Sequence, residues 1–206
     1  MKKYLAELVG TFVLVLCGTG AIVISNECNG IITHGQIAII FGLSVMTMIL
    51  VFGKISGAHI NPAVTIALAL VKKFKWKNVL PYIVSQIVGA MLASVLVMTI
   101  FPSNKLLGAT LPSVSVIECF VIELALTFIL MIGVLRAPGR YSGVIIGSIV
   151  GLEAYFAGKF TGASMNPARS LAPALVSGHT EYLWIYLTAP VLGAVIALFA
   201  NKLIRD

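Results

Sequence analysis

The sequence carries little charge. Only 10% of its 206 residues are Asp, Glu, Lys or Arg, against about 25% in an ordinary soluble domain. Hydrophobic residues make up 59% of the chain, which is more apolar surface than a soluble protein of this length covers. These proportions exclude a soluble domain and predict a membrane protein. Six nearly uncharged stretches approach the roughly 20 residues that a spanning helix needs: 8–24, 37–53, 82–101, 117–135, 143–157 and 183–200.

Cysteine and catalytic groups are also scarce. The three cysteines, Cys17, Cys28 and Cys119, are an odd number without the spacing of metal ligands. We interpret Cys17 and Cys119, which lie in apolar stretches, as packing residues. No nucleophile–base set, metal-binding cluster or glycine-rich phosphate loop stands out. The sequence therefore favours neither an enzyme nor a protein that carries a metal or another cofactor.

The N-terminus starts with two lysines and an apolar run, as signal peptides do. However, the run contains Glu7, and no small-x-small cleavage site follows it. We therefore expect it to be the first membrane span.

The net charge of +7 comes from basic residues whose distribution along the chain predicts its orientation in the membrane. If six spans place both termini on one side, most basic residues fall on that side, as is typical of cytoplasmic loops. We expect both termini in the cytoplasm, no nucleic-acid partner and, because the loops are short, a location in the cell (inner or plasma) membrane. The cytoplasmic set is Lys2, Lys3, Lys54, Lys72, Lys73, Lys75, Lys77, Arg136, Arg140, Lys202 and Arg205, and the opposite set is Lys105, Lys159 and Arg169.

One motif occurs twice, as "GAHINPAV" at 57–64 and "GASMNPAR" at 162–169. Each copy precedes an apolar piece of about ten residues, which as a helix rises about 15 Å, half of the roughly 30 Å hydrocarbon core. Asn is a favoured N-cap and Pro a favoured first helical residue. We predict two half-helices, capped by Asn61 and Asn166, that enter from opposite faces and meet near the midplane.

Other stretches repeat in the same order, so we divide the single domain 1–206 into two copies of three spans. An odd number of spans per copy turns the second copy upside down, which makes an inverted repeat. The copies are 4–101 and 115–204, joined by a linker at 102–114 that we expect outside the membrane. The additional matching pairs are "ELVGTFVLVL" with "ELALTFILMI" and "YIVSQIVGAMLA" with "YLTAPVLGAVIA".

Non-helical backbone precedes each half-helix, and we predict it at 54–61 and 159–166. Such backbone is tolerated at membrane depth only where protein buries it or water reaches it, so we infer an aqueous path. Two half-helix N-termini place partial positive charge at its centre. The side-chain N–H groups of Asn61 and Asn166 would orient a passing water molecule and so interrupt proton conduction, and the positive helix ends would repel cations.

The twin motifs resemble those of the aquaporin (major intrinsic protein) family, and the likeness covers the whole chain. The resemblance implies an all-α membrane protein, a right-handed bundle of six transmembrane helices plus two re-entrant half-helices, usually assembled as a homotetramer with a pore in each subunit. It also implies a central pore constriction, formed by Asn61, Pro62, Ala63, Asn166, Pro167 and Ala168.

The resemblance further implies an outer selectivity filter of Phe41, Ala154, Ala163 and Arg169. An arginine inside an apolar chain is costly and by default functional, and its charge would bind neutral polar solutes and repel cations. Water channels typically have histidine where this chain has Ala154, and glycerol facilitators typically have two aromatics and a glycine. The filter fits neither class and predicts a wider pore than that of a strict water channel.

Four other positions that distinguish water channels from glycerol facilitators in the family do not agree on one class. Ser170, Ala174 and Tyr186 match water channels, whereas Leu187 is more similar to glycerol facilitators and nodulin-26-like proteins.

Three glutamates and a histidine complete the candidate site. Glu7 and Glu123 match paired glutamates of the family, and we expect each to hold the re-entrant loop of its repeat through backbone N–H groups. His59 either hydrogen-bonds passing water or fixes loop backbone. Glu153 has either a structural hydrogen-bonding role or a role in gating at the pore mouth.

We therefore predict a passive channel for water and small uncharged solutes (glycerol, urea, ammonia or neutral metalloid hydroxides) that excludes protons and ions. One alternative is a strict water-only channel. Another is an ion-coupled secondary transporter, which generally needs carboxylates at the midplane, where this chain has Asn61 and Asn166. A non-conducting structural membrane protein is a third, although it would not need Arg169. The expected partners are water, neutral solutes, the lipid bilayer and other copies of the chain.

Overall fold

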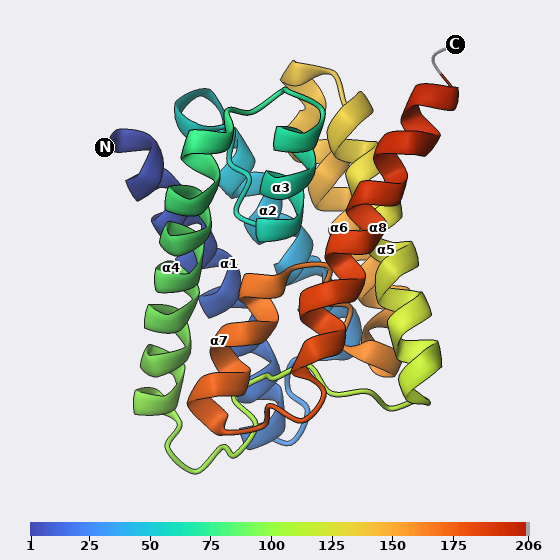
Figure 1. Ribbon diagram of the computed structural model, residues 1–206. Coiled ribbons are helices and arrows are strands. Elements are labelled where there is room, and N and C mark those ends of the chain that lie inside the picture. Colours follow the sequence, from blue (N-terminus) through green and yellow to red (C-terminus); the bar gives the residue numbers. More distant parts are fainter. Residues whose placement is uncertain (205–206) are drawn as a thin grey trace.

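The computed structural model describes residues 1–204, and throughout this range the regular structure is helical (Figure 1). Six helices are long and apolar enough to cross a membrane. They are α1 (Lys2–Glu27), α2 (His34–Ser56), α4 (Val79–Ile100), α5 (Val116–Arg136), α6 (Ser142–Thr161) and α8 (Leu183–Leu203). Two short helices, α3 (Pro62–Leu70) and α7 (Pro167–Ser177), follow the repeated motifs, and 3-10 turns at Trp76–Asn78 and Gly139–Tyr141 precede α4 and α6. The predicted fold class is confirmed.

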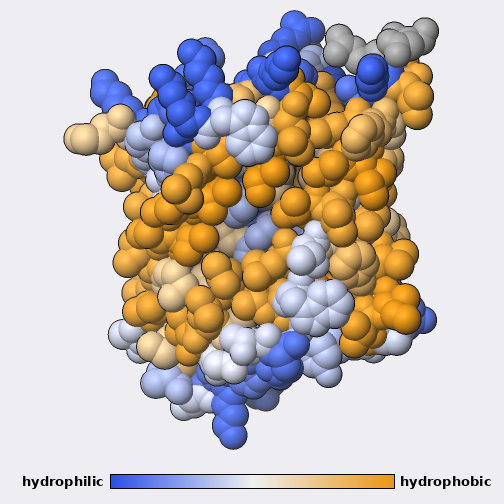
Figure 2. Space-filling model, in the orientation of Figure 1, coloured by the Kyte–Doolittle hydropathy of each residue, from blue (hydrophilic) through white to orange (hydrophobic). Residues whose placement is uncertain are grey.

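The surface shows why this chain requires a bilayer. On the face shown in Figure 2, apolar residues cover the middle of the molecule and hydrophilic residues gather at its two ends. Large apolar side chains such as Leu80, Phe156 and Phe199 are more than half exposed. Cys119 is buried, as expected of a packing residue, but the same expectation for Cys17 is wrong because Cys17 is exposed on α1.

Glycines let the long helices approach closely. On α4, a Cβ at Gly89 would collide with the carbonyl oxygen of Leu8 on α1, and on α8 one at Gly193 would collide with that of Leu124 on α5. Small residues allow such close backbone contact between membrane helices. The two helix pairs are therefore packed in the same way in the two halves of the chain.

The two short helices enter from opposite ends of the molecule, and their N-termini face each other at its centre (Figure 1). The non-helical segments before them are shorter than expected. Helix α2 continues to Ser56 and α6 to Thr161, and each ends at a glycine, Gly57 or Gly162, in the left-handed conformation. Only 57–61 and 162–166 are non-helical, so the predicted starts at 54 and 159 were wrong by three residues.

Both ends of the described chain lie at the same end of the molecule. The N-terminus and the C-terminal end of α8 are found there together (Figure 1). Six spanning helices require this arrangement. Arg205, which we counted among the cytoplasmic basic residues, and Asp206 lie outside the described residues.

Candidate functional site

The two re-entrant loops, 57–61 and 162–166, have the same backbone conformation. Positive φ angles occur at equivalent positions, although four of the six residues are not glycine. Such angles are uncommon outside glycine and indicate strain for a β-branched residue such as Ile60. The loops need external support to keep this shape. The paired values are Gly57 90° and Gly162 85°, Ala58 46° and Ala163 42°, and Ile60 42° and Met165 53°.

Glu7 supports the first loop. Its fully buried carboxylate accepts hydrogen bonds from the backbone N–H groups of His59 (2.9 Å) and Ile60 (2.7 Å). The Ser56 hydroxyl (2.7 Å) and the Gln86 amide (2.8 Å) also donate to it. A buried carboxylate is costly unless it is hydrogen-bonded, and these four donors meet that requirement.

Glu123 makes the equivalent contacts to the second loop. It is also fully buried, and it accepts from the backbone N–H groups of Ser164 (2.8 Å) and Met165 (2.9 Å) and from the Thr161 hydroxyl (2.7 Å). The Tyr186 hydroxyl donates to the Thr161 carbonyl at 2.8 Å. Each strained loop is thus held in shape by one buried glutamate, which accepts hydrogen bonds from the N–H groups of the loop.

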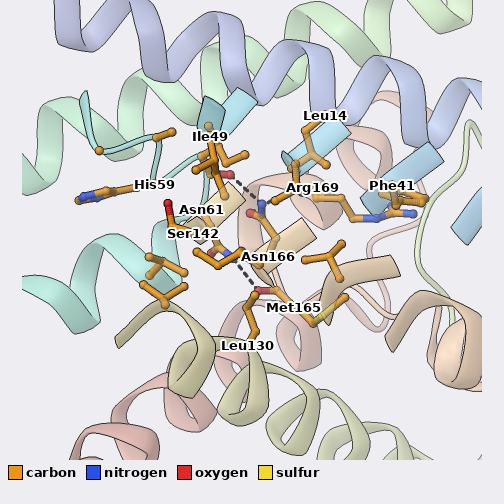
Figure 3. A pocket seen from close by; sticks show the side chains of 18 of the residues that line it. Leu14, Phe41, Ile49, His59, Asn61, Leu130, Ser142, Met165, Asn166 and Arg169 are labelled. Carbon is orange, nitrogen blue, oxygen red and sulfur yellow. Dashed lines mark hydrogen bonds between the residues drawn. The ribbon is translucent and has the colours of Figure 1, made fainter. Parts of the chain in front are cut away.

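The two asparagines connect the loops at the centre. Asn61 and Asn166 cap α3 and α7, accepting through their side-chain oxygens from the N–H groups of Ala63 (2.9 Å) and Ala168 (3.0 Å). Their amide nitrogens donate across the centre, Asn61 to the Met165 carbonyl and Asn166 to Ile60, both at 2.8 Å (Figure 3). Since an amide nitrogen carries two hydrogens, each asparagine retains a second N–H.

A cavity of about 260 Å³ runs along these loops. His59 and Ser142 lie on one side of the asparagines and Phe41 and Arg169 on the other (Figure 3). The wall opposite the loops is apolar, because α1, α2, α5 and α6 contribute aliphatic side chains to it. Its members include Leu14, Val45, Leu130 and Val150.

The loops contribute backbone oxygens to this cavity. The described residues contain no cis peptide bond, and in a trans peptide the C=O points opposite to the N–H. Because the loop N–H groups point to the buried glutamates, the carbonyls of Ala58, His59, Ala163 and Ser164 point away from them. All four residues line the cavity. Their oxygens accept no hydrogen bond from the described residues, which leaves them available to a solute.

Of the predicted central constriction, only the asparagines line the cavity. Pro62 and Pro167 are the first residues of α3 and α7, and Ala63 and Ala168 are fully buried. These four residues lie behind the asparagines and start the half-helices.

The four predicted filter residues, Phe41, Ala154, Ala163 and Arg169, all line the cavity. The Arg169 guanidinium lies 5.0 Å from the centre of the Phe41 ring and donates from Nη1 to the Gly108 carbonyl at 2.9 Å. Its Nε is buried without a partner among the described residues.

Two glycines that support the filter were not predicted from the sequence. Gly18 on α1 gives room to Phe41, because a Cβ there would collide with the ring. Gly108 belongs to the linker, and its carbonyl holds Arg169. The linker, which we predicted to lie outside the membrane, packs onto the helices, and its Leu107 is only 2% exposed. Because Arg169 is held by a backbone carbonyl, no side chain in the sequence marks this contact. The only indication in the sequence is the glycine itself, which adopts a positive φ of 72° in the structure.

His59 lies at the cavity on the side away from the filter. Its Nδ1 is 3.1 Å from the Thr65 hydroxyl, and its ring packs against Phe74 and Tyr82. These contacts fix the ring, while the side chain still borders the cavity.

Glu153 does not line the cavity, although its neighbour Ala154 does. The side chain is 7% exposed, and both carboxyl oxygens are buried without a hydrogen-bond partner among the described residues. The structure therefore gives no partner for the structural hydrogen bond that we had considered.

Six spanning helices around a cavity with two re-entrant loops define a passive transmembrane channel. Known proteins agree with this class. The family model described as "Major intrinsic protein" matches residues 1–201. The whole chain aligns at 43% identity with "Aquaporin NIP1-1" of Zea mays, covering 75% of that protein, and at 40% with "Nodulin-26" of Glycine max, covering 78%.

A solved structure gives the same result. The "aquaglyceroporin from Plasmodium falciparum" superposes with a TM-score of 0.86 at 29% identity, covering 98% of this chain and 96% of that one. The chain belongs to the major intrinsic protein family, as the twin motifs had predicted. It is a membrane channel for water and small neutral solutes, and not an enzyme.

Proposed function

We propose that the pore is the cavity between the re-entrant loops and that it conducts water together with solutes as large as glycerol or urea. The observation that carries this proposal is that one cavity borders both asparagines, all four filter residues and four unpaired loop carbonyls. Ammonia and neutral metalloid hydroxides belong to the same class of small uncharged solutes.

The filter selects by charge and width. Arg169 offers N–H donors and a fixed positive charge, which attract polar solutes and repel cations. Phe41 forms an apolar wall, against which the carbon side of a polyol packs. Ala154 and Ala163 leave the remaining sides open, and this supports passage of solutes wider than water.

The central asparagines exclude protons and cations. The second N–H groups of Asn61 and Asn166 hold the oxygen of a passing water, so that this water does not donate to its neighbours on both sides. The positive ends of α3 and α7 add to the barrier. Glu7 and Glu123 keep the loops in shape, and His59 orders water on the inner side.

We further infer that the chain is one domain of two inverted repeats, 4–101 and 115–204, with the linker at 102–114. The excess of basic residues at the end with the N-terminus supports a cytoplasmic position for that end, in the inner or plasma membrane. Membership of the major intrinsic protein family supports the homotetramer that is usual in that family.

Stopped-flow light scattering on proteoliposomes tests the solute range. Vesicles challenged with impermeant sucrose should shrink quickly, and vesicles challenged with glycerol or urea should shrink and swell again. Shrinkage without re-swelling would leave a water-only channel, in which Phe41 and Arg169 suffice to exclude solutes. Uptake that follows a proton or sodium gradient would instead indicate a coupled transporter.

A further inference from the structure

A surface groove of about 670 Å³ lies between the end of α3 and the last turns of α8. It lies away from the loops and the filter, at the end of the molecule that carries the N-terminus (Figure 1). A second hollow of about 490 Å³ adjoins it and shares Lys73, Leu135 and Asn201 with it. In both hollows, apolar residues of the helices lie next to basic residues of the same end of the molecule.

Positive charge is concentrated around these hollows. Lys72, Lys73 and Lys202 line the groove and Arg136 lines the adjoining hollow, whereas no lining residue within 1–204 is acidic. Arg136 donates from Nε to the Asn201 side chain at 3.0 Å, which orients the guanidinium and leaves its terminal nitrogens free for another acceptor. The site therefore suits an anion.

Local structure holds the lysines at this place. Helix α3 ends at Leu70, and Lys72 adopts a left-handed φ of 59°. The Lys73 N–H then donates back to the Leu68 carbonyl at 2.9 Å. A lysine in this conformation is uncommon, and the turn sets the two lysines side by side next to α8.

The rest of the groove is apolar. Leu70, Val71, Leu198 and Phe199 form its walls, and Phe199 is 67% exposed. A free inorganic anion would gain nothing from these walls. An anion that carries acyl chains would use both parts of the site, because its chains would cover the apolar walls.

We propose that this groove binds an anionic phospholipid, with the phosphate among Lys72, Lys73, Lys202 and Arg136 and an acyl chain along Leu70 and Phe199. Basic pockets between membrane helices on the cytoplasmic side recognise anionic lipid headgroups in this way. Lys73 also lines the pore cavity, so the lipid and the pore mouth share one side chain. The test therefore leaves Lys73 unchanged.

Native mass spectrometry of the detergent-purified protein, titrated with dioleoyl phosphatidylglycerol or dioleoyl phosphatidylcholine, measures the binding. The wild type should bind phosphatidylglycerol about tenfold more tightly. The double variant Lys72→Gln/Lys202→Gln should lose this preference. The matched control Lys75→Gln/Lys77→Gln, which removes two exposed charges from the same end outside the groove, should keep it.

The apolar part is tested with Phe199→Ala, which should weaken phosphatidylglycerol binding a few-fold, and with glycerophosphate, which lacks acyl chains and should not compete. Equal affinity for the two lipids, or a preference unchanged in Lys72→Gln/Lys202→Gln, would overturn the proposal. Competition by glycerophosphate at the concentration of the lipid would also overturn it, because the site would then bind free anions. Stopped-flow water permeability of each variant verifies that the channel is folded.

Discussion

Ala154 sets the width of the filter at the scale of single residues. It faces the same cavity as Phe41, Ala163 and Arg169, and its methyl group leaves space that a larger side chain would fill. We expect Ala154→His to reduce glycerol permeability at least tenfold, while osmotic water permeability changes less than about threefold. A tenfold reduction corresponds to an increase of about 1.4 kcal/mol in the free-energy barrier to glycerol passage. Stopped-flow measurements on proteoliposomes give both rates.

Ala154→Ser is the matched control, because it adds a hydroxyl with little bulk and should leave both rates near those of the wild type. Glycerol flux that persists in Ala154→His would place the limiting constriction elsewhere in the cavity.

Glu153 is the residue with the least favourable surroundings. Its carboxyl oxygens are buried and unpaired, and an unpaired buried polar group costs about 1–3 kcal/mol. We expect Glu153→Leu to raise the thermal unfolding temperature in detergent, because leucine has similar volume and no polar atoms. Since the side chain lies off the cavity, Glu153→Gln should leave water permeability unchanged between pH 5 and 8. A changed permeability or pH response at equal expression would instead assign Glu153 a gating role.

At the scale of helices, paired glycines determine how closely the spans pack. Gly89→Ala and Gly193→Ala would each press a methyl group onto a backbone carbonyl of the neighbouring helix, and backbone gives way less easily than a side chain. We expect each variant to lose about 1–3 kcal/mol of stability, measured as lower unfolding temperature by scanning fluorimetry.

Gly20 provides the control for these glycines. It lies within α1, where an added Cβ meets nothing within 4 Å, so Gly20→Ala should be neutral or stabilising by up to about 1 kcal/mol. Equal destabilisation of all three variants would contradict this explanation, because the loss of stability would then not depend on close contact with a neighbouring backbone.

The elements also show what the sequence could predict. Six long apolar runs predicted the spans, and Asn-Pro predicted the caps of α3 and α7, because both signals are local. The start of the re-entrant segments was predicted three residues early, because Lys54 and Lys159 still belong to the last turns of α2 and α6, which end only at Gly57 and Gly162. The contact between Gly108 of the linker and Arg169 joins residues that are 61 positions apart, and no local pattern predicts it.

The whole molecule has two chemically different ends, and this asymmetry predicts its orientation. Basic residues gather at the end with the N-terminus, and cytoplasmic loops are the ones enriched in lysine and arginine. Cys28 caps the C-terminal end of α1 and is exposed, so it lies at the opposite end of the molecule. The orientation thus predicts that Cys28 is reached from outside the cell.

A membrane-impermeant maleimide should therefore label the protein in intact cells, and Cys28→Ser should abolish the labelling. The polar maleimide reaches thiols at the two aqueous ends, whereas Cys17 and the buried Cys119 lie within the candidate membrane spans α1 and α5. In the Cys28→Ser background, Lys75→Cys places a thiol at the basic end, which should react only after the cells are permeabilised. The reverse pattern, with Lys75→Cys labelled in intact cells and Cys28 protected, would show that the N-terminal end faces the outside. That result would contradict the prediction that the end rich in lysine and arginine is cytoplasmic.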